Sequence, residues 1–220
     1  MKLDPEKMRE LVRRNTVPAV LPFIPELRLH LVTEETPLWR ATDAHLEREG
    51  LASPYWAFAW AGGQSVARYV LDNPQLVTGK RVLDFAAGSG LVAIAAMKVG
   101  ASSARATDID AVAIEAARLN AALNDVAIDL VVGDVVDDPC EDIDVVLVGD
   151  VFFDRELAQR CTRWFGSLAD RGVLVLVGDP GRYFSPKEGR TRRARYVLPE
   201  SPEIDGEGVR HCDVFAVDPR

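Results

Sequence analysis

Small residues fill a short turn in the segment Arg81–Ala96, which reads RVLDFAAGSGLVAIAA. Ala86, Gly88 and Gly90 leave room for a ligand against the main chain, because a larger side chain there would collide with it. The amides at the start of the helix that follows can bind a negative group. The spacing A-x-G-x-G departs from the G-x-G-x-x-G of dinucleotide folds, since Leu91 stands where the third glycine would be. The turn therefore favours a nucleoside ligand smaller than a dinucleotide.

Aspartates stand close to the carboxyl ends of four expected strands: Asp84, Asp108, Asp134 and Asp150. In open α/β sheets the ligand lies beyond this edge, where the strand order reverses. Asp108 follows Gly90 by 18 residues, a position from which a carboxylate can accept both hydroxyls of a ribose. The alternative for any one aspartate is a helix cap or a strand end. Four aspartates at the same sheet edge as the small-residue turn favour a ligand site.

The elements that must position these residues alternate along the chain from Gly79 onward. Continuous Val and Leu runs are typical of strands buried on both faces of a parallel sheet. Strand–helix alternation predicts a doubly wound, Rossmann-like α/β domain with a mostly parallel sheet. The expected strands are 81–86, 103–109, 128–134, 143–150 and 172–179, and the expected helices are 91–101, 111–124 and 155–170.

The two ends of the chain differ from this core. Segments 194–200 and 209–218 are expected to form a hairpin that adds an antiparallel edge and brings the sheet to seven strands. Residues 1–62 begin with a short helix and continue into PAVLPFIPELRLHLV, which prolines interrupt. We expect an N-terminal extension that is laid on the core or caps a site. The chain is then a single domain, 1–220, with its binding core in residues 63–220.

Composition excludes several classes of protein. The 220 residues are 48% hydrophobic and carry a net charge of −8, which argues against disorder and against a nucleic-acid-coating protein. Three cysteines without a CxxC pair and three isolated histidines argue against a disulfide framework or a metal site. No apolar run approaches the ~18 residues of a membrane span, and the charged N-terminus lacks a signal core. We expect a monomeric cytoplasmic protein.

Four motifs together resemble the class I, seven-strand S-adenosylmethionine-dependent methyltransferases: VLDFAAGSG, ATDID, VVGD and DVVLVGD. The resemblance covers roughly residues 53–218, and Ala86 stands where that family has its first glycine. It implies that Gly88 and Gly90 face the methionine part of S-adenosylmethionine, that Asp108 holds the ribose, and that the adenine meets Asp134 and Val135. We expect a cofactor site made of Trp56, Trp60, Gly63, Gln64, Asp84, Ala86, Gly88, Ser89, Gly90, Asp108, Ile109, Asp134, Val135 and Asp150, with S-adenosylhomocysteine as the product.

Two further segments, SPYWAFAWAGGQSVARYVLDNP (53–74) and GDVFFD (149–154), narrow the resemblance. They are similar to the lysine methyltransferases of the electron transfer flavoprotein β-subunit, whose relatives include ribosomal-protein methyltransferases. GDPGRYF (178–184) is also similar to this family, whereas Ala61 stands where proline is expected. The resemblance implies methyl transfer to lysine side chains of a protein, with the flavoprotein β-subunit as the substrate and an acidic ribosomal protein as a second possible target.

A lysine nucleophile must be uncharged, although its ordinary pKa is about 10.4. An apolar, aromatic pocket beside a sulfonium would lower that pKa. Phe152 and Phe153 are expected to form this surface, with Asp150 orienting the amine or accepting its proton. Asp154 either caps the following helix or receives a substrate cation. The predicted catalytic residues are thus Asp150 and Phe153, and the predicted substrate contacts are Phe152, Phe153 and Asp154.

Two features leave alternatives open. Trp56 and Trp60 share one helical face if their segment is helical, and they form either a wall over the cofactor or plain core packing. The basic run KEGRTRRAR (187–195) is either a solvated loop, the preferred interpretation, or an electrostatic landing site for an acidic protein partner.

Small-molecule or nucleic-acid methylation and a non-catalytic nucleoside-binding protein remain the alternative functions. No N-P-P-Y-like motif follows the fourth strand, which disfavours methylation of base nitrogens.

Overall fold

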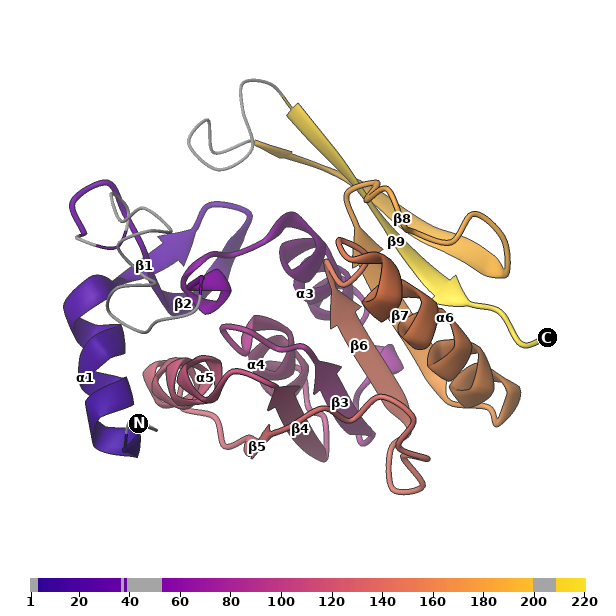
Figure 1. Cartoon of the computed structure of the whole chain (residues 1–220), viewed down its shortest axis with the longest axis horizontal. Helices are drawn as coiled ribbons and strands as arrows, with labels where there is room; N and C mark the ends of the chain where they lie inside the picture. The colour runs from indigo at the N-terminus through magenta and orange to yellow at the C-terminus, as the bar shows by residue number, and fades with distance from the viewer. Residues whose placement is uncertain (1–3, 37, 39–52, 200–208) are drawn as a thin grey trace.

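One seven-stranded sheet carries the expected strands in the order β5-β4-β3-β6-β7-β9-β8 (Figure 1). The computed structural model describes residues 4–36, 38, 53–199 and 209–220. Strands β3 to β7 pair in parallel, whereas β9 pairs antiparallel with both β7 and β8. The bounds are β3 (Arg81–Phe85), β4 (Ser103–Asp108), β5 (Asp129–Val132), β6 (Val145–Gly149), β7 (Leu174–Asp179), β8 (Arg190–Pro199) and β9 (Val209–Val217). The predicted mostly parallel sheet with an antiparallel C-terminal hairpin is confirmed.

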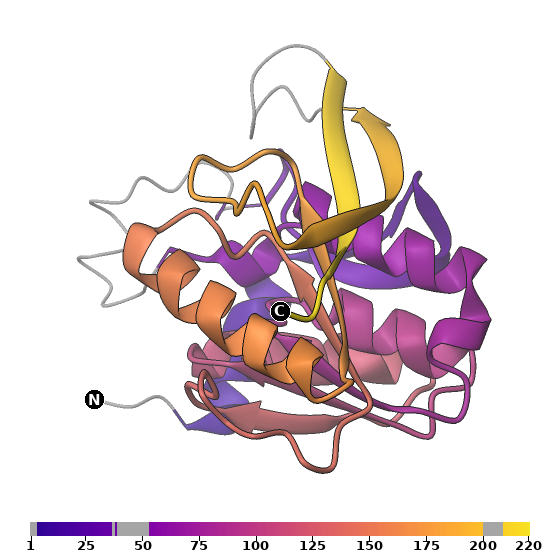
Figure 2. The same ribbon diagram turned by 90° about the vertical axis from the view of Figure 1, so that its right-hand side faces the viewer.

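Helices cover both faces of the sheet (Figures 1 and 2). Alternate residues of β3 point to opposite sides, so Val82 packs toward α3 and α4 while Leu83 and Phe85 pack toward α6. Both faces are therefore buried, which explains the continuous apolar strands. The helices are α3 (Ala61–Asp72), α4 (Leu91–Lys98), α5 (Ala111–Leu123) and α6 (Arg155–Asp170), with the 3-10 turns η2 (Tyr55–Ala57) and η3 (Pro74–Leu76).

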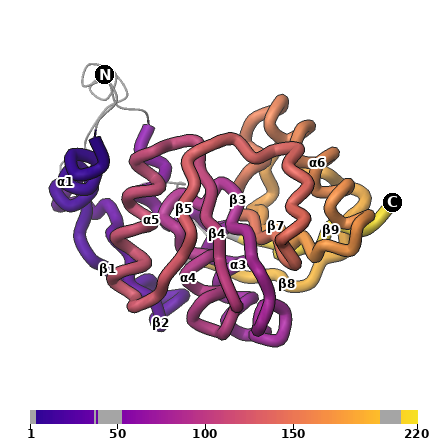
Figure 3. Tube along the Cα trace, turned by 90° about the horizontal axis from the view of Figure 1, so that it is seen from below, coloured from indigo at the N-terminus to yellow at the C-terminus, as the bar shows by residue number. Residues whose placement is uncertain are grey.

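The N-terminal extension packs on α5. This is the first of its two predicted arrangements, an extension laid on the core. It consists of α1 (Pro5–Asn15) and the hairpin β1 (Val17–Leu21) and β2 (Ile24–Leu31), which lie beyond α5 at the end of the molecule (Figure 3). Val12 is fully buried there, and Arg9 pairs with Glu115 at 2.6 Å. The Asn120 side-chain oxygen accepts the backbone N–H of His30 at 2.7 Å. Long-range polar contacts therefore fix the extension to the core.

The expected solvated loop at 187–195 is wrong for most of its length. β8 begins at Arg190, so the arginines lie on the edge strand of the sheet. Arg195 and Arg192 pair with Asp213 of the neighbouring strand at 2.6 and 3.8 Å. Charged side chains protect an edge strand from pairing with another chain, so this basic composition suits a strand as well as a loop.

Three further features of the described residues concern a membrane span, a metal site and disulfide bonds. Among the described helices, none has the length and apolar character needed to cross a bilayer. Across the described ranges, no group of three His, Cys, Asp or Glu side chains could hold a metal ion. Cys140, Cys161 and Cys212 are buried free thiols.

Candidate active site

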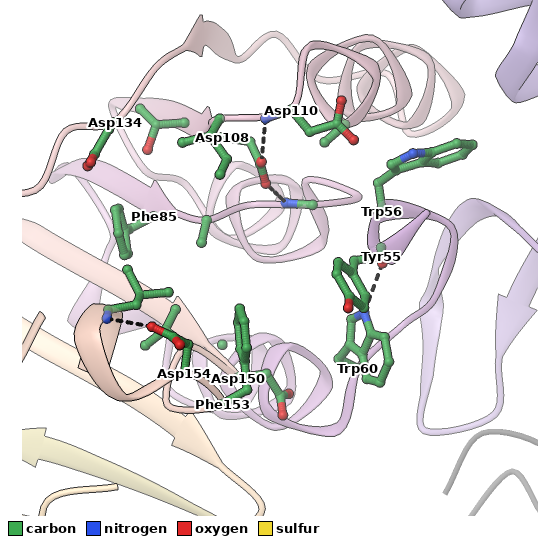
Figure 4. Close-up of a pocket in the computed structure, with 18 of the residues that line it drawn as sticks. Tyr55, Trp56, Trp60, Phe85, Asp108, Asp110, Asp134, Asp150, Phe153 and Asp154 are labelled. Atoms are coloured by element: carbon green, nitrogen blue, oxygen red, sulfur yellow. Dashed lines mark hydrogen bonds between the residues drawn. The ribbon is translucent and has the colours of Figure 1, made fainter. Parts of the chain in front are cut away.

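A cavity of about 770 Å³ opens at the carboxyl ends of the parallel strands, where the strand order changes direction beside β3 (Figure 4). Its walls come from the loops after β3, β4, β5, β6 and β7, from η2 and from the start of α6. Many of the predicted site residues line it: Trp56, Trp60, Ala86, Gly88, Asp108, Ile109, Asp134, Asp150, Phe153 and Asp154. The cavity therefore lies where the aspartates and the small-residue turn predicted a ligand.

The turn after β3 forms one side of the cavity and is coupled to Asp108. One carboxylate oxygen of Asp108 accepts the N–H of Gly88 at 2.9 Å, and the other accepts the N–H of Asp110 at 2.9 Å. Burial raises the pKa of Asp108, while these backbone N–H groups act in the opposite direction. Each oxygen keeps a further lone pair, so the side chain can still accept hydrogen bonds from a ligand.

Backbone conformation explains why the turn needs small residues. Ala86, Gly88 and Gly90 have φ of 54°, 51° and 76°, in the left-handed region that costs about 1–2 kcal/mol for a residue with a Cβ. Ala86 therefore carries a strain that glycine would avoid. A Cβ on Gly90 would meet Ala117 of α5, so this glycine serves the packing of two helices. A Cβ on Gly88 would meet only the Trp56 backbone at 3.8 Å, across the cavity wall.

The remaining predicted cofactor residues do not line the cavity. Asp84 is buried and accepts the N–H of Ala93 at 2.9 Å, and desolvation raises its pKa to about 7. The carbonyl of Ser89 accepts the side-chain amide of Asn120 at 2.9 Å. The side-chain amide of Gln64 donates to a backbone carbonyl at 2.6 Å. Roles of these residues in cofactor binding stay predictions, as do those of Gly63, Gly90 and Val135.

Asp150 closes the opposite side of the cavity from Asp108 (Figure 4). Its φ is 57°, and its carboxylate is held on both oxygens. Oδ1 accepts Nη2 and Nε of Arg182 at 2.8 and 3.1 Å, and Oδ2 accepts the N–H of Gly62 at the start of α3. Burial raises the pKa of Asp150, whereas the Arg182 guanidinium and the Gly62 N–H lower it. The carboxylate thus ties α3 and the loop after β7 to the end of β6.

Sequence reasoning missed Arg182, although the segment GDPGRYF that contains it was singled out. Asp179 at the end of β7 accepts the N–H groups of Gly181 and Arg182 at 3.1 and 3.2 Å, which fixes the loop. The Arg182 guanidinium also lies 5.9 Å from the Trp60 ring centroid. Arg160 was missed as well: it lines the cavity and pairs with Asp134 at 2.8 Å. No local pattern marks either arginine, because both contacts depend on the tertiary fold.

The two neighbouring phenylalanines separate. Phe153 is 59% exposed, lines the cavity and lies 6.4 Å from the Tyr55 ring, which sequence reasoning also missed. Phe152 is 1% exposed and packs against Phe165 and Phe215 in the core. The expected substrate contact of Phe152 is therefore wrong, because its ring fills the space between the sheet and α6.

Trp56 and Trp60 do not share a helical face, because the chain is not helical between them. Trp56 is buried in η2, and Trp60 precedes α3 in extended conformation, with its indole N–H donating to the Tyr55 carbonyl at 2.8 Å. Both nevertheless line the cavity. Asp154 caps α6 through the N–H of Leu157 at 2.9 Å, which confirms the first of its two predicted roles. It also lines the cavity, and its contact with a substrate cation stays a prediction.

These residues fit a nucleoside. A carboxylate at the end of β4 offers acceptors for hydroxyl groups, and the turn beside it presents main chain without bulky side chains. The aromatic rings of Trp56, Trp60 and Phe85 supply apolar wall. The sequence predicted a nucleoside ligand from the same small-residue turn and the same aspartate.

Comparisons with known proteins decide the family. Residues 69–152 match the family model described as ribosomal protein L11 methyltransferase (PrmA). The electron transfer flavoprotein β-subunit lysine methyltransferase of Xenopus laevis is 37% identical over 217 residues, which cover 96% of this chain and 87% of that protein. The human protein of the same name is 35% identical over 229 residues, covering 99% and 84%.

This chain belongs to the electron transfer flavoprotein β-subunit lysine methyltransferase family. Membership confirms the predicted enzyme class, a class I methyltransferase that uses S-adenosylmethionine. Among solved structures, a Pyrococcus horikoshii protein has a TM-score of 0.56 at 13% identity, covering 98% of each chain. The ribosomal protein L11 methylase of Lactobacillus delbrueckii has a TM-score of 0.50 at 20% identity, covering 71% of this chain and 79% of the other. At these sequence identities the likeness shows only that this chain and the two solved proteins share a fold.

Proposed function

We propose that this chain transfers methyl groups from S-adenosylmethionine to lysine side chains of the electron transfer flavoprotein β-subunit. The observation that carries the proposal is the convergence of Asp108, Asp150 and Phe153 on one cavity in a chain of this family. The proposed unit of function is a single methyltransferase domain with residues 1–62 as an extension. Its cytoplasmic location and monomeric state stay predictions.

The side of the cavity around Asp108 is the proposed place of the cofactor. Asp108 would accept the ribose hydroxyls, the backbone at Ala86 and Gly88 would face the methionine part, and Asp134 would lie near the adenine. When bound, S-adenosylmethionine supplies a methyl group on a sulfonium; the amine nitrogen bonds to this carbon as the carbon–sulfur bond breaks and its electron pair goes to sulfur. The protein has no covalent chemistry to perform, so orientation and exclusion of water are its tasks.

The side around Asp150 is the proposed place of the lysine. Phe153 and Tyr55 present exposed rings there, and Trp60 lies next to Tyr55 at 5.9 Å between ring centroids. These rings can surround the aliphatic part of a lysine and keep water from the amine. The role of Asp150 in orienting the amine or accepting its proton stays a prediction.

A ribosomal protein is the second candidate substrate, because the matching family model describes methyltransferases of ribosomal protein L11. The test is transfer of radiolabelled methyl from S-adenosylmethionine into a cell extract, followed by identification of the labelled species. We expect a labelled band that mass spectrometry identifies as the flavoprotein β-subunit. Label in L11 instead would favour the second candidate. Label only in small molecules, or none at all, would refute protein methylation.

A further inference from the structure

The guanidinium of Arg182 occupies the side of the cavity that faces the proposed lysine. Arg182 lines the cavity, and its side chain is 26% exposed. The cation lies against Asp150 on one side and 5.9 Å from the Trp60 ring centroid on the other. A cation between a carboxylate and an aromatic ring is the arrangement that a lysine ammonium would also favour. The chain therefore already fills this arrangement with its own arginine.

Both carboxylate oxygens of Asp150 consequently already accept hydrogen bonds, and its negative charge is balanced by Arg182. Oδ1 is shared by two nitrogen atoms of Arg182, and Oδ2 accepts the N–H of Gly62. The pair of Asp150 and Arg182 is neutral as a whole. An ammonium that enters beside it gains little from the carboxylate and meets a positive guanidinium at short range.

We propose that Arg182 is a positioning residue which, by holding Asp150, makes the lysine site select the uncharged amine over the ammonium. This inference rests on the proposed function. The lysine gives its proton to water, and the amine then lies against Phe153 and Tyr55 with its lone pair free. A neighbouring cation is one of the ways in which enzymes obtain a neutral lysine nucleophile.

Other charged groups face the same space, and each has a partner or lies away from the pair of Asp150 and Arg182. Asp179 lies behind the pair, where its charge raises the pKa of Asp150. Asp134 is neutralised by Arg160. Asp154 accepts a backbone N–H of α6, and Asp108 accepts two backbone N–H groups on the opposite side of the cavity. Among the residues that the structure describes, the titratable and charged groups in the cavity wall are Tyr55, Asp108, Asp110, Asp134, Asp150, Asp154, Arg160 and Arg182.

Binding of two peptides to the complex with S-adenosylhomocysteine tests this role apart from catalysis. One peptide spans the methylated lysine of the substrate, and the other has norleucine, an uncharged analogue, in its place. Calorimetry at pH 7 gives the ratio of the lysine Kd to the norleucine Kd. We expect Arg182→Gln to lower this ratio about tenfold or more, because a released Asp150 binds the ammonium. We also expect kcat at pH 7 to fall and its pH profile to move about one unit upward, because the bound lysine keeps its proton.

Three variants separate this role from a structural one. Arg182→Lys keeps the positive charge and should keep the wild-type ratio. Asp150→Asn combined with Arg182→Gln removes both charges and should restore the ratio, although a merely structural Arg182 would give no restoration. Arg155→Gln is the matched control, because Arg155 lies over the Phe184 ring and does not line the cavity. Arg182→Met, which retains an apolar stem, replaces Arg182→Gln if that variant does not fold.

The outcomes distinguish this inference from the proposed function. A folded Arg182→Gln protein with an unchanged ratio, or with a raised kcat, would overturn the inference while wild-type methylation stands. A raised kcat would mean that Arg182 obstructs the lysine. If the wild-type protein methylates no lysine of the flavoprotein subunit, the proposed function itself fails.

Discussion

The N–H of Gly88 donates a hydrogen bond to the carboxylate of Asp108 at 2.9 Å, and this bond joins the turn after β3 to the end of β4. The second oxygen of Asp108 is held by the N–H of Asp110, which starts the connection to α5. Backbone groups thus fix the carboxylate before any ligand arrives. A pre-organised acceptor loses less entropy on binding than a mobile one. The contact therefore explains how two segments 20 residues apart act as one site.

Replacing Asp108 by alanine should weaken binding of S-adenosylhomocysteine by about tenfold to a hundredfold, because hydrogen bonds to a charged acceptor contribute roughly 1.5–3 kcal/mol. Calorimetric titration measures this. Asp129→Ala removes an exposed aspartate at the start of β5 and is the control for net charge. Equal affinity of folded Asp108→Ala and wild-type protein would remove Asp108 from the site.

Phe152 and Phe153 form a matched pair of neighbours with opposite surroundings. Phe152→Ala should lower the free energy of unfolding by about 3–5 kcal/mol, because it empties space in the core. Phe153→Ala should change stability by less than about 1 kcal/mol and lower kcat/KM for the protein substrate, because its exposed ring lines the cavity. Denaturant unfolding and initial rates measure both. The reverse order of the two stability effects would contradict the assigned packing.

Gly62 and Gly63 offer a second matched pair, in the first turn of α3. A Cβ on Gly62 would overlap the carbonyl of Gly178 and the side chain of Asp150, whereas a Cβ on Gly63 would have no neighbour within 4 Å. Gly62→Ala should destabilise the protein by about 1–3 kcal/mol. Gly63→Ala should leave the melting temperature unchanged or raise it, since alanine favours helix by about 0.5–1 kcal/mol. Similar losses in both variants would contradict the close contact of α3 with the sheet.

Asp84 should make stability depend on pH. Its pKa is raised from 3.8 to about 7 by burial, so the native state holds this proton over a range in which the unfolded state has lost it. The free energy of unfolding from this group therefore falls as pH rises from about 4 to about 7 and is level above. Asp84→Asn removes this dependence. The difference in melting temperature, variant minus wild type, should grow between pH 4 and pH 7, and a constant difference would show that Asp84 is ionised throughout.

Local sequence patterns predicted the features that depend on local physics. Asp110 and Asp154 cap helices that begin at the next residue, and the turn around Gly88 lies where small residues allow positive φ. Patterns failed where the outcome depends on distant packing. Phe152 and Phe153 are the same residue type, and Phe152 is the buried one because its ring packs against Phe165 of α6 and Phe215 of β9.

Spacing also misled where the backbone changes conformation. The interval from Trp56 to Trp60 matches one helical turn, yet a 3-10 turn and an extended residue fill it. Arg182 follows Asp150 by 32 residues and meets it only because β7 lies beside β6 and returns its loop to the same edge. No rule of sequence spacing predicts that contact, so the sequence could identify Asp150 as a site residue but not Arg182 as its partner.

Methylation of the substrate is best tested by intact-mass spectrometry of purified electron transfer flavoprotein β-subunit after incubation with this enzyme and S-adenosylmethionine. We expect the subunit to gain whole methyl groups, fragmentation to place them on lysine, and Asp108→Ala to slow the gain. A subunit whose mass stays unchanged after incubation with folded enzyme that binds S-adenosylhomocysteine would contradict this expectation.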